Sequence, residues 1–178
     1  MDINKAILLY LNHLSTERNL AANTLSSYKK DLDNYANWLN LNQQDLTKVL
    51  EKDIQKFLSS FRKNRAETSV NRMIASVRGL HKFLMLENLV KDNAAKYLEV
   101  GSRAMRLPKT IDAHTIIKLI ESIPAAESDD VRNKLIFEFL YGTGARISEL
   151  VNIDLEDIDV NDDLIKIRFG KGSKQRIV

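Results

Sequence analysis

Apolar residues recur every three or four positions through most of the first half of the chain, which is the spacing of amphipathic helices. The pattern predicts four helices, at residues 5–17, about 24–39, 51–63 and 66–87. Their inward-facing positions are Ile7, Leu8, Leu11 and Leu14; Leu25, Tyr28, Leu32, Tyr35, Ala36 and Leu39; Ile54, Phe57, Leu58 and Phe61; and Val70, Met73, Ile74, Val77, Leu80 and Leu84. We therefore expect a four-helix core in this half.

The sequence of this half also predicts the N-cap residues of the first two helices and three aromatic core positions. Asn4 is the expected N-cap of the first helix, and Asn23 or Thr24 that of the second, because their side chains can accept a hydrogen bond from the first turn. The second helix carries three aromatic residues that we assign to the core: Tyr28, Tyr35 and Trp38. A short further helix is expected near residues 93–99.

The second half mixes helical and strand patterns. A helix capped by Asp112 carries Ile116, Ile117, Leu119 and Ile120, and a longer apolar helix ends at Tyr141, with residues 135–141 expected to be mostly buried. Residues 157–160 and 164–169 alternate at period two around a turn at 161–163, and residues 175–178 resemble a third strand. The fold expected is mainly α, with a small antiparallel hairpin or sheet.

Composition divides the chain into a helical domain at residues 1–100, a linker at 101–109 and a second domain at 110–178. The linker contains glycine, serine, proline and basic residues without periodicity. The sequence has no cysteine, and its three histidines are isolated, so we expect no metal site. It also lacks a secretory n-region and any apolar run of about 20 residues, from which we expect a cytoplasmic protein without a membrane partner.

Charge is unevenly distributed between the two halves. Residues 1–107 hold 17 Lys and Arg against 11 Asp and Glu, a net charge of +6, whereas residues 108–178 hold 10 against 13, a net charge of −3. A basic first half is typical of a phosphate-binding surface, and it is also common on ordinary solvated helices.

Small and basic residues share the side of the helix at 66–87 that lies opposite its apolar stripe. They are Arg65, Thr68, Arg72, Ala75, Ser76, Gly79 and Lys82. Short side chains permit close approach to a DNA backbone, while Arg and Lys can contact phosphate and guanine. The polar side of the second helix adds Ser26, Lys29, Lys30 and Asp33. Both surfaces are candidates for duplex DNA, and both could be plain solvent surface.

Two glycines interrupt the apolar helix at the segment Gly-Thr-Gly-Ala-Arg-Ile-Ser-Glu-Leu, residues 142–150. Gly142 or Gly144 can supply the positive φ that closes a helix, and Arg146 then opens a new one. Glu149 follows three residues later on the same helical face, where its carboxylate can orient the Arg146 guanidinium. A helix cap followed by a surface ion pair would give the same pattern.

The motifs, taken in order, resemble the tyrosine recombinases, in the XerC and XerD form that resolves bacterial chromosome dimers. Residues 17–39 are similar to the start of the family's SAM-like core-binding domain, in which helices two and four grip the major groove. Residues 107–111, Leu-Pro-Lys-Thr-Ile, resemble the start of its catalytic domain. A Gly-Lys-Gly turn around Lys171, followed by Ser-Lys-Gln-Arg-Ile-Val, resembles the hairpin that carries the active-site lysine.

This resemblance implies a reaction and a set of roles. In the family a tyrosine hydroxyl attacks a DNA phosphodiester, giving a 3′-phosphotyrosyl link and a free 5′-hydroxyl, and no cofactor is needed. By motif, Arg146 would clamp the non-bridging oxygens, Lys171 would protonate the leaving oxygen and Glu149 would orient the site. Partner recombinase subunits would form a tetramer on the recombination site.

The chain departs from the family pattern in its last part. None of the three histidines is followed by Arg at the third position, and we assign Tyr141 to the core and not to catalysis. The resemblance thus covers a core-binding domain and roughly the first third of a catalytic domain, and the 178-residue chain is expected to bind DNA without the nucleophile. A non-catalytic DNA-binding protein, or part of a phage or mobile-element integrase, is the alternative.

Overall fold

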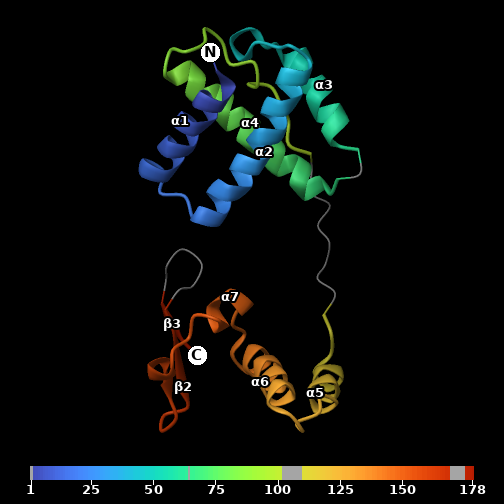
Figure 1. The fold of residues 1–178 in the computed structure, drawn as a ribbon, viewed down its shortest axis with the longest axis vertical. Coiled ribbons are helices and arrows are strands. Elements are labelled where there is room, and N and C mark those ends of the chain that lie inside the picture. The colour runs from blue at the N-terminus through green and yellow to red at the C-terminus, as the bar shows by residue number, and fades with distance from the viewer. Residues whose placement is uncertain (1, 64, 102–109, 169–174) are drawn as a thin grey trace. The chain divides into compact units, whose positions relative to one another are not determined.

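The chain divides into two compact units, Met1–Met105 and Arg106–Val178, each described here by itself (Figure 1). The computed structural model describes residues 2–63, 65–101, 110–168 and 175–178. Most of the linker expected at 101–109 therefore lies outside the described residues. The first unit is helical, and the second combines helices with a small sheet.

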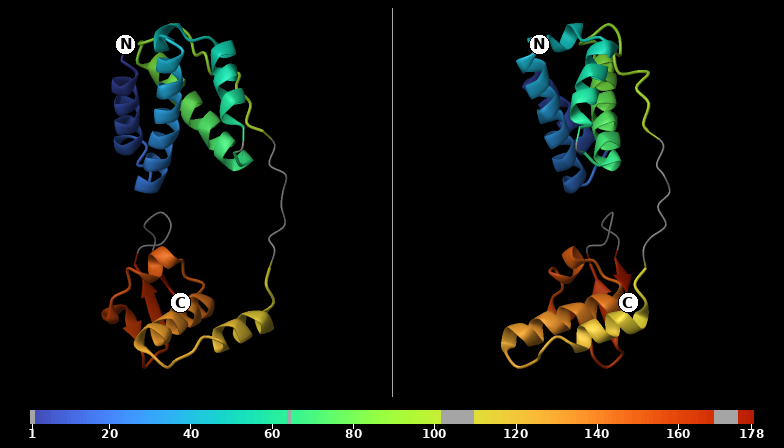
Figure 2. Two further views of the ribbon diagram at one scale, coloured as in Figure 1. Left: turned by 45° about the vertical axis from the view of Figure 1, so that its right-hand side comes forward. Right: turned by 90° about the vertical axis from the view of Figure 1, so that its right-hand side faces the viewer.

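Helix α4 is the central element of the first unit. The helices of this unit are α1 (Ile3–Thr16), α2 (Ala22–Leu41), α3 (Glu51–Phe61) and α4 (Glu67–Leu86), with a single 3-10 turn, η1 (Leu46–Lys48). α4 contacts α1, α2 and α3, and α2 also packs against α1 (Figure 2). The four predicted helices are therefore confirmed, with ends that differ from the prediction by a few residues.

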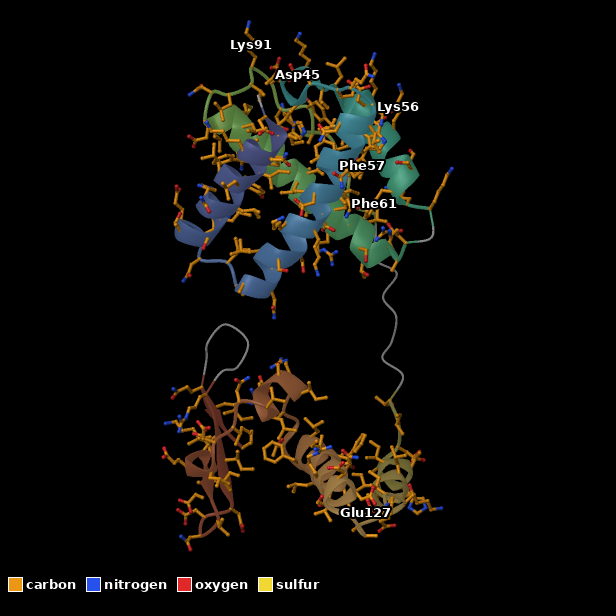
Figure 3. The ribbon with its side chains drawn as sticks, in the orientation of Figure 1. Asp45, Lys56, Phe57, Phe61, Lys91 and Glu127 are labelled. Carbon is orange, nitrogen blue, oxygen red and sulfur yellow. The ribbon has the colours of Figure 1, made fainter. Side chains whose placement is uncertain are left out.

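The predicted apolar stripe of α4 forms the centre of the core. All six of its members are at most 1% exposed: Val70, Met73, Ile74, Val77, Leu80 and Leu84. Tyr35 is completely buried, while Tyr28 and Trp38 are partly buried against the same core, so the aromatic assignment holds. Figure 3 labels two further rings, Phe57 and Phe61, whose centroids lie 5.8 Å apart. Burying each large apolar side chain contributes about 1.5–3 kcal/mol. Among the described residues, the second unit has only Ile120 and Ile167 as buried hydrophobic side chains, so the first unit is the better packed of the two.

Two polar pairs are built into this core. The Tyr35 hydroxyl lies 3.0 Å from Nε2 of His81, which is 1% exposed, and burial lowers the pKa of His81 to about 4. Arg72 of α4 donates from Nε and Nη2 to the two carboxylate oxygens of Asp31 on α2, at 2.7 and 3.1 Å. The Arg72–Asp31 pair therefore links α4 to α2, the two helices whose polar surfaces are candidates for DNA contact.

Three local predictions for the first unit are wrong. Asp2, not Asn4, caps α1, because its carboxylate accepts the Asn4 N–H at 2.9 Å. α2 begins at Ala22, after Ala21, without a side-chain cap. Residues 94–97 form turns and no helix is present at 93–99, where Ala95 and Leu98 are buried.

The second unit begins with three helices. They are α5 (Ala113–Glu121), α6 (Ser128–Thr143) and α7 (Ile147–Leu150). Asp112 caps α5 as predicted, since its carboxylate accepts the Thr115 N–H at 2.9 Å. The expected burial of residues 135–141 is wrong: no residue of α6 is fully buried, and Phe137 and Tyr141 are each 46% exposed. Apolar residues occur all around α6, whereas the described part of this unit covers only some of its surface.

A three-stranded antiparallel sheet completes the second unit. β1 (Ile158–Asp159) pairs with β2 (Leu164–Ile167), which pairs with β3 (Arg176–Ile177), after a 3-10 turn, η2 (Leu155–Asp157). Asp163, with φ at 53°, completes the predicted turn between β1 and β2. Ile167 faces Arg176 across the β2–β3 pair, so the sheet fixes the position of Arg176.

Candidate active site and nucleic-acid interface

The turn after α6 presents Arg146. Gly144 adopts φ 60° and its N–H donates to the Leu140 carbonyl at 3.0 Å, which closes α6 in the left-handed conformation that glycine favours. The Thr143 hydroxyl donates to the Phe139 carbonyl at 2.7 Å and accepts the Ala145 N–H at 3.1 Å. The chain therefore reverses within two residues, and Arg146 becomes the N-cap residue of α7. This confirms the prediction from the two glycines, with Gly144 as the residue of positive φ.

Glu149 holds Arg146 from both backbone and side chain. The Arg146 N–H donates to Oε2 of Glu149 at 2.8 Å, and Nη1 donates to Oε1 at 2.7 Å. The side chain of Glu149 is 2% exposed, whereas that of Arg146 is 58% exposed. The predicted pairing of the two residues is confirmed. A buried carboxylate thus fixes a guanidinium that still faces solvent.

Arg176 is a third member of the site that the sequence analysis did not identify. It donates from Nη1 and Nη2 to Oε1 and Oε2 of Glu149, at 3.1 and 2.8 Å. These hydrogen bonds, followed by that from the Arg146 backbone, lower the pKa of Glu149 to about 2. Glu149 and Arg176 are 27 positions apart, so no local spacing could have indicated the contact.

The three charges make a site suited to an anion. Two guanidinium groups share one carboxylate, so the cluster carries a net positive charge at neutral pH. The N–H groups of Arg146 that do not contact Glu149 remain available to phosphate oxygens, which a planar guanidinium binds well. No group of three or more potential metal ligands occurs among the described residues.

The structure bears differently on the predicted catalytic residue Lys171 and on Tyr141, which was predicted to lie in the core. Lys171 lies outside the described residues, so its role remains a prediction. Tyr141, which the sequence analysis placed in the core, is 46% exposed near the end of α6. Exposure alone gives it no catalytic role, but it removes the packing argument against one.

The candidate DNA-contacting residues of α4 fall into three groups. Arg65, Thr68 and Lys82 are exposed, as expected. Arg72 has a 43% exposed side chain but is tied to Asp31. Ser76 is completely buried and its hydroxyl donates to the Met73 carbonyl at 2.9 Å, so its predicted place on the outer face is wrong. Position 76 lies three residues after Met73 and four before Leu80, on the buried side.

On α2, both candidate lysines are exposed. Lys29 forms an ion pair with Asp33, with 2.7 Å between Nζ and Oδ2. Both groups of this pair are largely solvated, so the pair is weak and can be exchanged for a contact with phosphate.

Among the described residues no helix is long and apolar enough to span a membrane.

Sequence comparison gives two family matches that together cover most of the chain. The N-terminal SAM-like domain of phage integrase matches residues 7–88, and the phage integrase family matches residues 109–178. Tyrosine recombinase XerD of Mycobacterium tuberculosis H37Rv is 39% identical over 182 residues, which cover 95% of this chain and 58% of that protein. XerD of Corynebacterium glutamicum is 34% identical over 179 residues, covering 95% and 59%. The chain thus spans less than two thirds of the length of these relatives.

Structural comparison gives the same fold. A lambda integrase tetramer bound to a Holliday junction aligns with a TM-score of 0.79 at 16% identity, covering 100% of this chain and 50% of that one. The XerH site-specific recombinase bound to a palindromic difH substrate aligns at 0.70 and 21% identity, covering 90% and 49%. The predicted fold class, a helical SAM-like domain followed by an α+β integrase-like domain, is confirmed.

Proposed function

The chain belongs to the phage integrase family of tyrosine recombinases, and we propose that it supplies the DNA grip and the phosphate clamp of a Xer-type site-specific recombinase. The observation that carries the proposal is the Arg146–Glu149 pair. An exposed guanidinium, fixed from behind by a buried carboxylate, is prepared to receive the non-bridging oxygens of a phosphodiester.

The proposed reaction keeps the number of phosphoester bonds constant. A tyrosine oxygen forms a bond to phosphorus while the bond from phosphorus to the 5′-oxygen breaks, leaving a 3′-phosphotyrosyl link. The tyrosine hydroxyl releases its proton to solvent, Arg146 stabilises the negative charge on the non-bridging oxygens of the pentacoordinate phosphorus, and Lys171 gives a proton to the departing 5′-oxygen. Rejoining to another strand reverses these steps. We propose that the nucleophilic tyrosine and the second arginine motif lie outside these 178 residues.

The first unit supports the DNA-binding part of the proposal. Helices α2 and α4 pack against each other and carry exposed basic residues, and residues 1–107 have a net charge of +6. A duplex would contact Lys29 and Lys30 of α2 and Thr68 and Lys82 of α4. The lambda integrase neighbour is a tetramer on a Holliday junction, which supports assembly with partner recombinase subunits on DNA. Resolution of chromosome dimers is the biological role we propose.

Titration of a labelled 30-base-pair duplex with the 178-residue chain tests the DNA-binding part. We expect log K to fall steeply and linearly with log salt, because each neutralised phosphate contributes about 0.9 to the slope. Failure to bind duplex DNA at low salt would contradict the proposal. Binding without any cutting by the complete protein would favour the non-catalytic alternative.

A further inference from the structure

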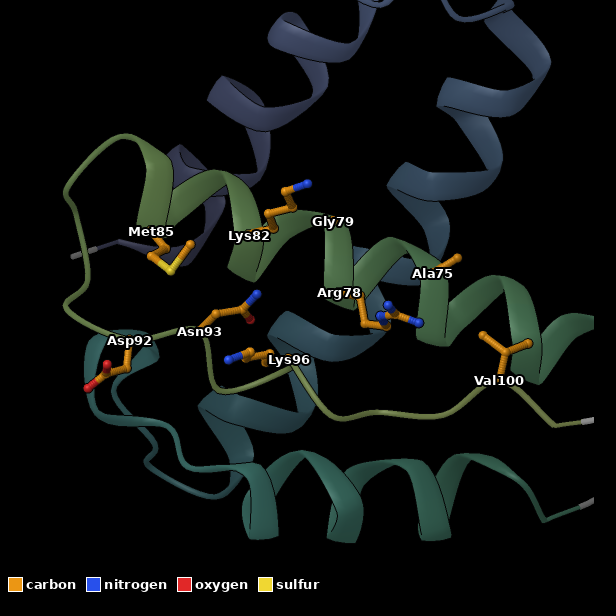
Figure 4. A pocket seen from close by; sticks show the side chains of 9 residues that line it. All are labelled: Ala75, Arg78, Gly79, Lys82, Met85, Asp92, Asn93, Lys96 and Val100. Carbon is orange, nitrogen blue, oxygen red and sulfur yellow. The ribbon is translucent and has the colours of Figure 1, made fainter.

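A basic groove lies along α4, on the side where the chain returns after that helix. Its volume is about 640 Å³, and its two walls are α4 and residues 92–100 (Figure 4). Three cationic side chains line it, Arg78 and Lys82 from α4 and Lys96 from the opposite wall, against one carboxylate, Asp92. In the part of the chain that the structure describes, none of the three cations has a carboxylate oxygen within 4.0 Å.

The second wall of the groove is firmly attached to α4. Ala95 is completely buried and Leu98 is 6% exposed, which fixes the middle of the segment in the core. At its end, the Asn71 side chain donates to the Gly101 carbonyl and accepts the Gly101 N–H, both at 3.1 Å. The groove is thus preformed, and binding an ion there requires little ordering of the chain.

The charges in the groove favour an anion. Arg78 and Lys82 are four residues apart on one helix, a spacing at which like charges repel. Lys96 adds a third positive charge from the other wall. Ala75, a small residue on the α4 wall, leaves room for an anion to come close to the helix. A phosphate group would relieve the repulsion by accepting hydrogen bonds from cations on both sides.

We propose that this groove binds a backbone phosphate of duplex DNA through Arg78 and Lys96. Duplex DNA is the favoured source of phosphate because the groove shares Ala75, Gly79 and Lys82 with the α4 surface assigned to DNA. The inference rests on the proposed function, and it extends the DNA interface to residues 92–100, which the sequence pattern did not assign. The carboxylate of Asp92, which also lines the groove, would repel a phosphate bound there.

The salt dependence of duplex binding by the 178-residue chain tests this inference. Arg78→Gln and Lys96→Gln should each weaken binding and reduce the slope of log K against log salt by about 0.9. Asp92→Asn should strengthen binding. The controls are Lys56→Gln on α3 and Lys91→Gln at the position before Asp92. Both lysines are exposed and neither lines the groove, so each variant loses one positive charge and should leave the slope unchanged (Figure 3).

The outcomes separate this inference from the proposed function. Unchanged slopes in Arg78→Gln and Lys96→Gln, with a reduced slope in Lys82→Gln, would overturn the groove and leave the DNA-binding face intact. Equal losses in the two control variants would also overturn it, because they would indicate a general effect of net charge. Absence of duplex binding by the unmodified chain would overturn both proposals.

Discussion

Arg176 on β3 donates two hydrogen bonds to the carboxylate of Glu149 on α7, at 3.1 and 2.8 Å, and so joins the sheet to the helix that presents Arg146. The same carboxylate accepts from the backbone and side chain of Arg146. Glu149 is therefore the common anchor of two arginines, and the position of Arg146 depends on a strand 30 residues away from it in sequence.

The first prediction concerns the titration of Glu149. In Arg176→Ala its pKa should rise from about 2 toward the ordinary value near 4.5, because the largest cause of the shift is removed. A lowered pKa contributes stability that is present above the unfolded pKa and is lost as pH falls toward 2. The variant should therefore lose less stability in that range. NMR titration of carbon-13-labelled side-chain carboxyls measures the pKa directly.

Arg132→Ala is the matched control, since Arg132 forms an exposed pair with Asp129 on α6. It should leave the Glu149 titration unchanged. If Glu149 titrates equally in the Arg176 variant and the unmodified chain, the three-residue cluster is not formed in solution.

A second prediction uses two glycines in different surroundings. A Cβ at Gly79 would lie 1.9 Å from Oη and 2.9 Å from Cζ of Tyr10, so Gly79→Ala should destabilise the first unit by about 1–3 kcal/mol. Gly142 has no such neighbour within 4 Å and lies in α6, so Gly142→Ala should be neutral or stabilise by up to about 1 kcal/mol.

Chemical denaturation followed by Trp38 fluorescence measures the cost at Gly79, because this single tryptophan packs against the core of the first unit. Circular dichroism follows the Gly142 variant. Combining Gly79→Ala with Tyr10→Phe should reduce the cost, since the closest atom is gone. If Gly79→Ala lowers stability by the same amount in the unmodified chain and in the Tyr10→Phe background, the contact with the Tyr10 hydroxyl does not cause the loss.

The third prediction is a loss of stability in acid that His81 causes. Its pKa is about 4 in the folded protein and about 6.5 when unfolded, so the unfolded chain binds more protons between these values. Stability should therefore fall as pH decreases from 6.5 to 4, by about 3 kcal/mol in total. His81→Gln, measured by Trp38 fluorescence, should lose most of this pH dependence, while the exposed His114→Gln should keep it. An unchanged pH profile in His81→Gln would contradict the assignment.

The fourth prediction distinguishes two basic residues of α4. Lys82→Ala should reduce the salt slope of DNA binding by about 0.9 without lowering stability. Arg72→Ala should also weaken binding, but it leaves the 4% exposed carboxylate of Asp31 without its partner and should cost about 1–3 kcal/mol of stability. Glu87→Ala, just after the end of α4, should change neither property. Salt titration and denaturation of the three variants decide whether Arg72 stabilises the contact between α2 and α4, as the structure indicates.

Local sequence patterns predicted those features that depend on neighbours three or four residues apart. The α4 stripe, the Asp112 cap and the Arg146–Glu149 pair are all of this kind. Ser76 was misassigned because it lies at the border of the stripe, where spacing alone does not separate the buried side from the outer one. The caps of α1 and α2 differed by two or three residues, close to the one or two residues by which helix ends usually vary.

Features that depend on residues distant in sequence could not be predicted in this way. The Arg176–Glu149 and Arg72–Asp31 pairs join residues 27 and 41 positions apart, and no local pattern indicates either pairing. The exposure of α6 has a related cause. Its apolar residues indicate that it can be buried, but only the surrounding elements decide whether it is.

The central proposal is that this chain builds the phosphate clamp of a recombinase site and that the nucleophile lies outside its 178 residues. The most direct test is incubation of the 178-residue chain with a nicked suicide duplex bearing the site that it selects from a random pool, followed by denaturing electrophoresis. We predict a complex in native gels and no covalent protein–DNA band after denaturation. A covalent band that disappears in Tyr141→Phe would contradict the claim and identify the exposed Tyr141 as the nucleophile.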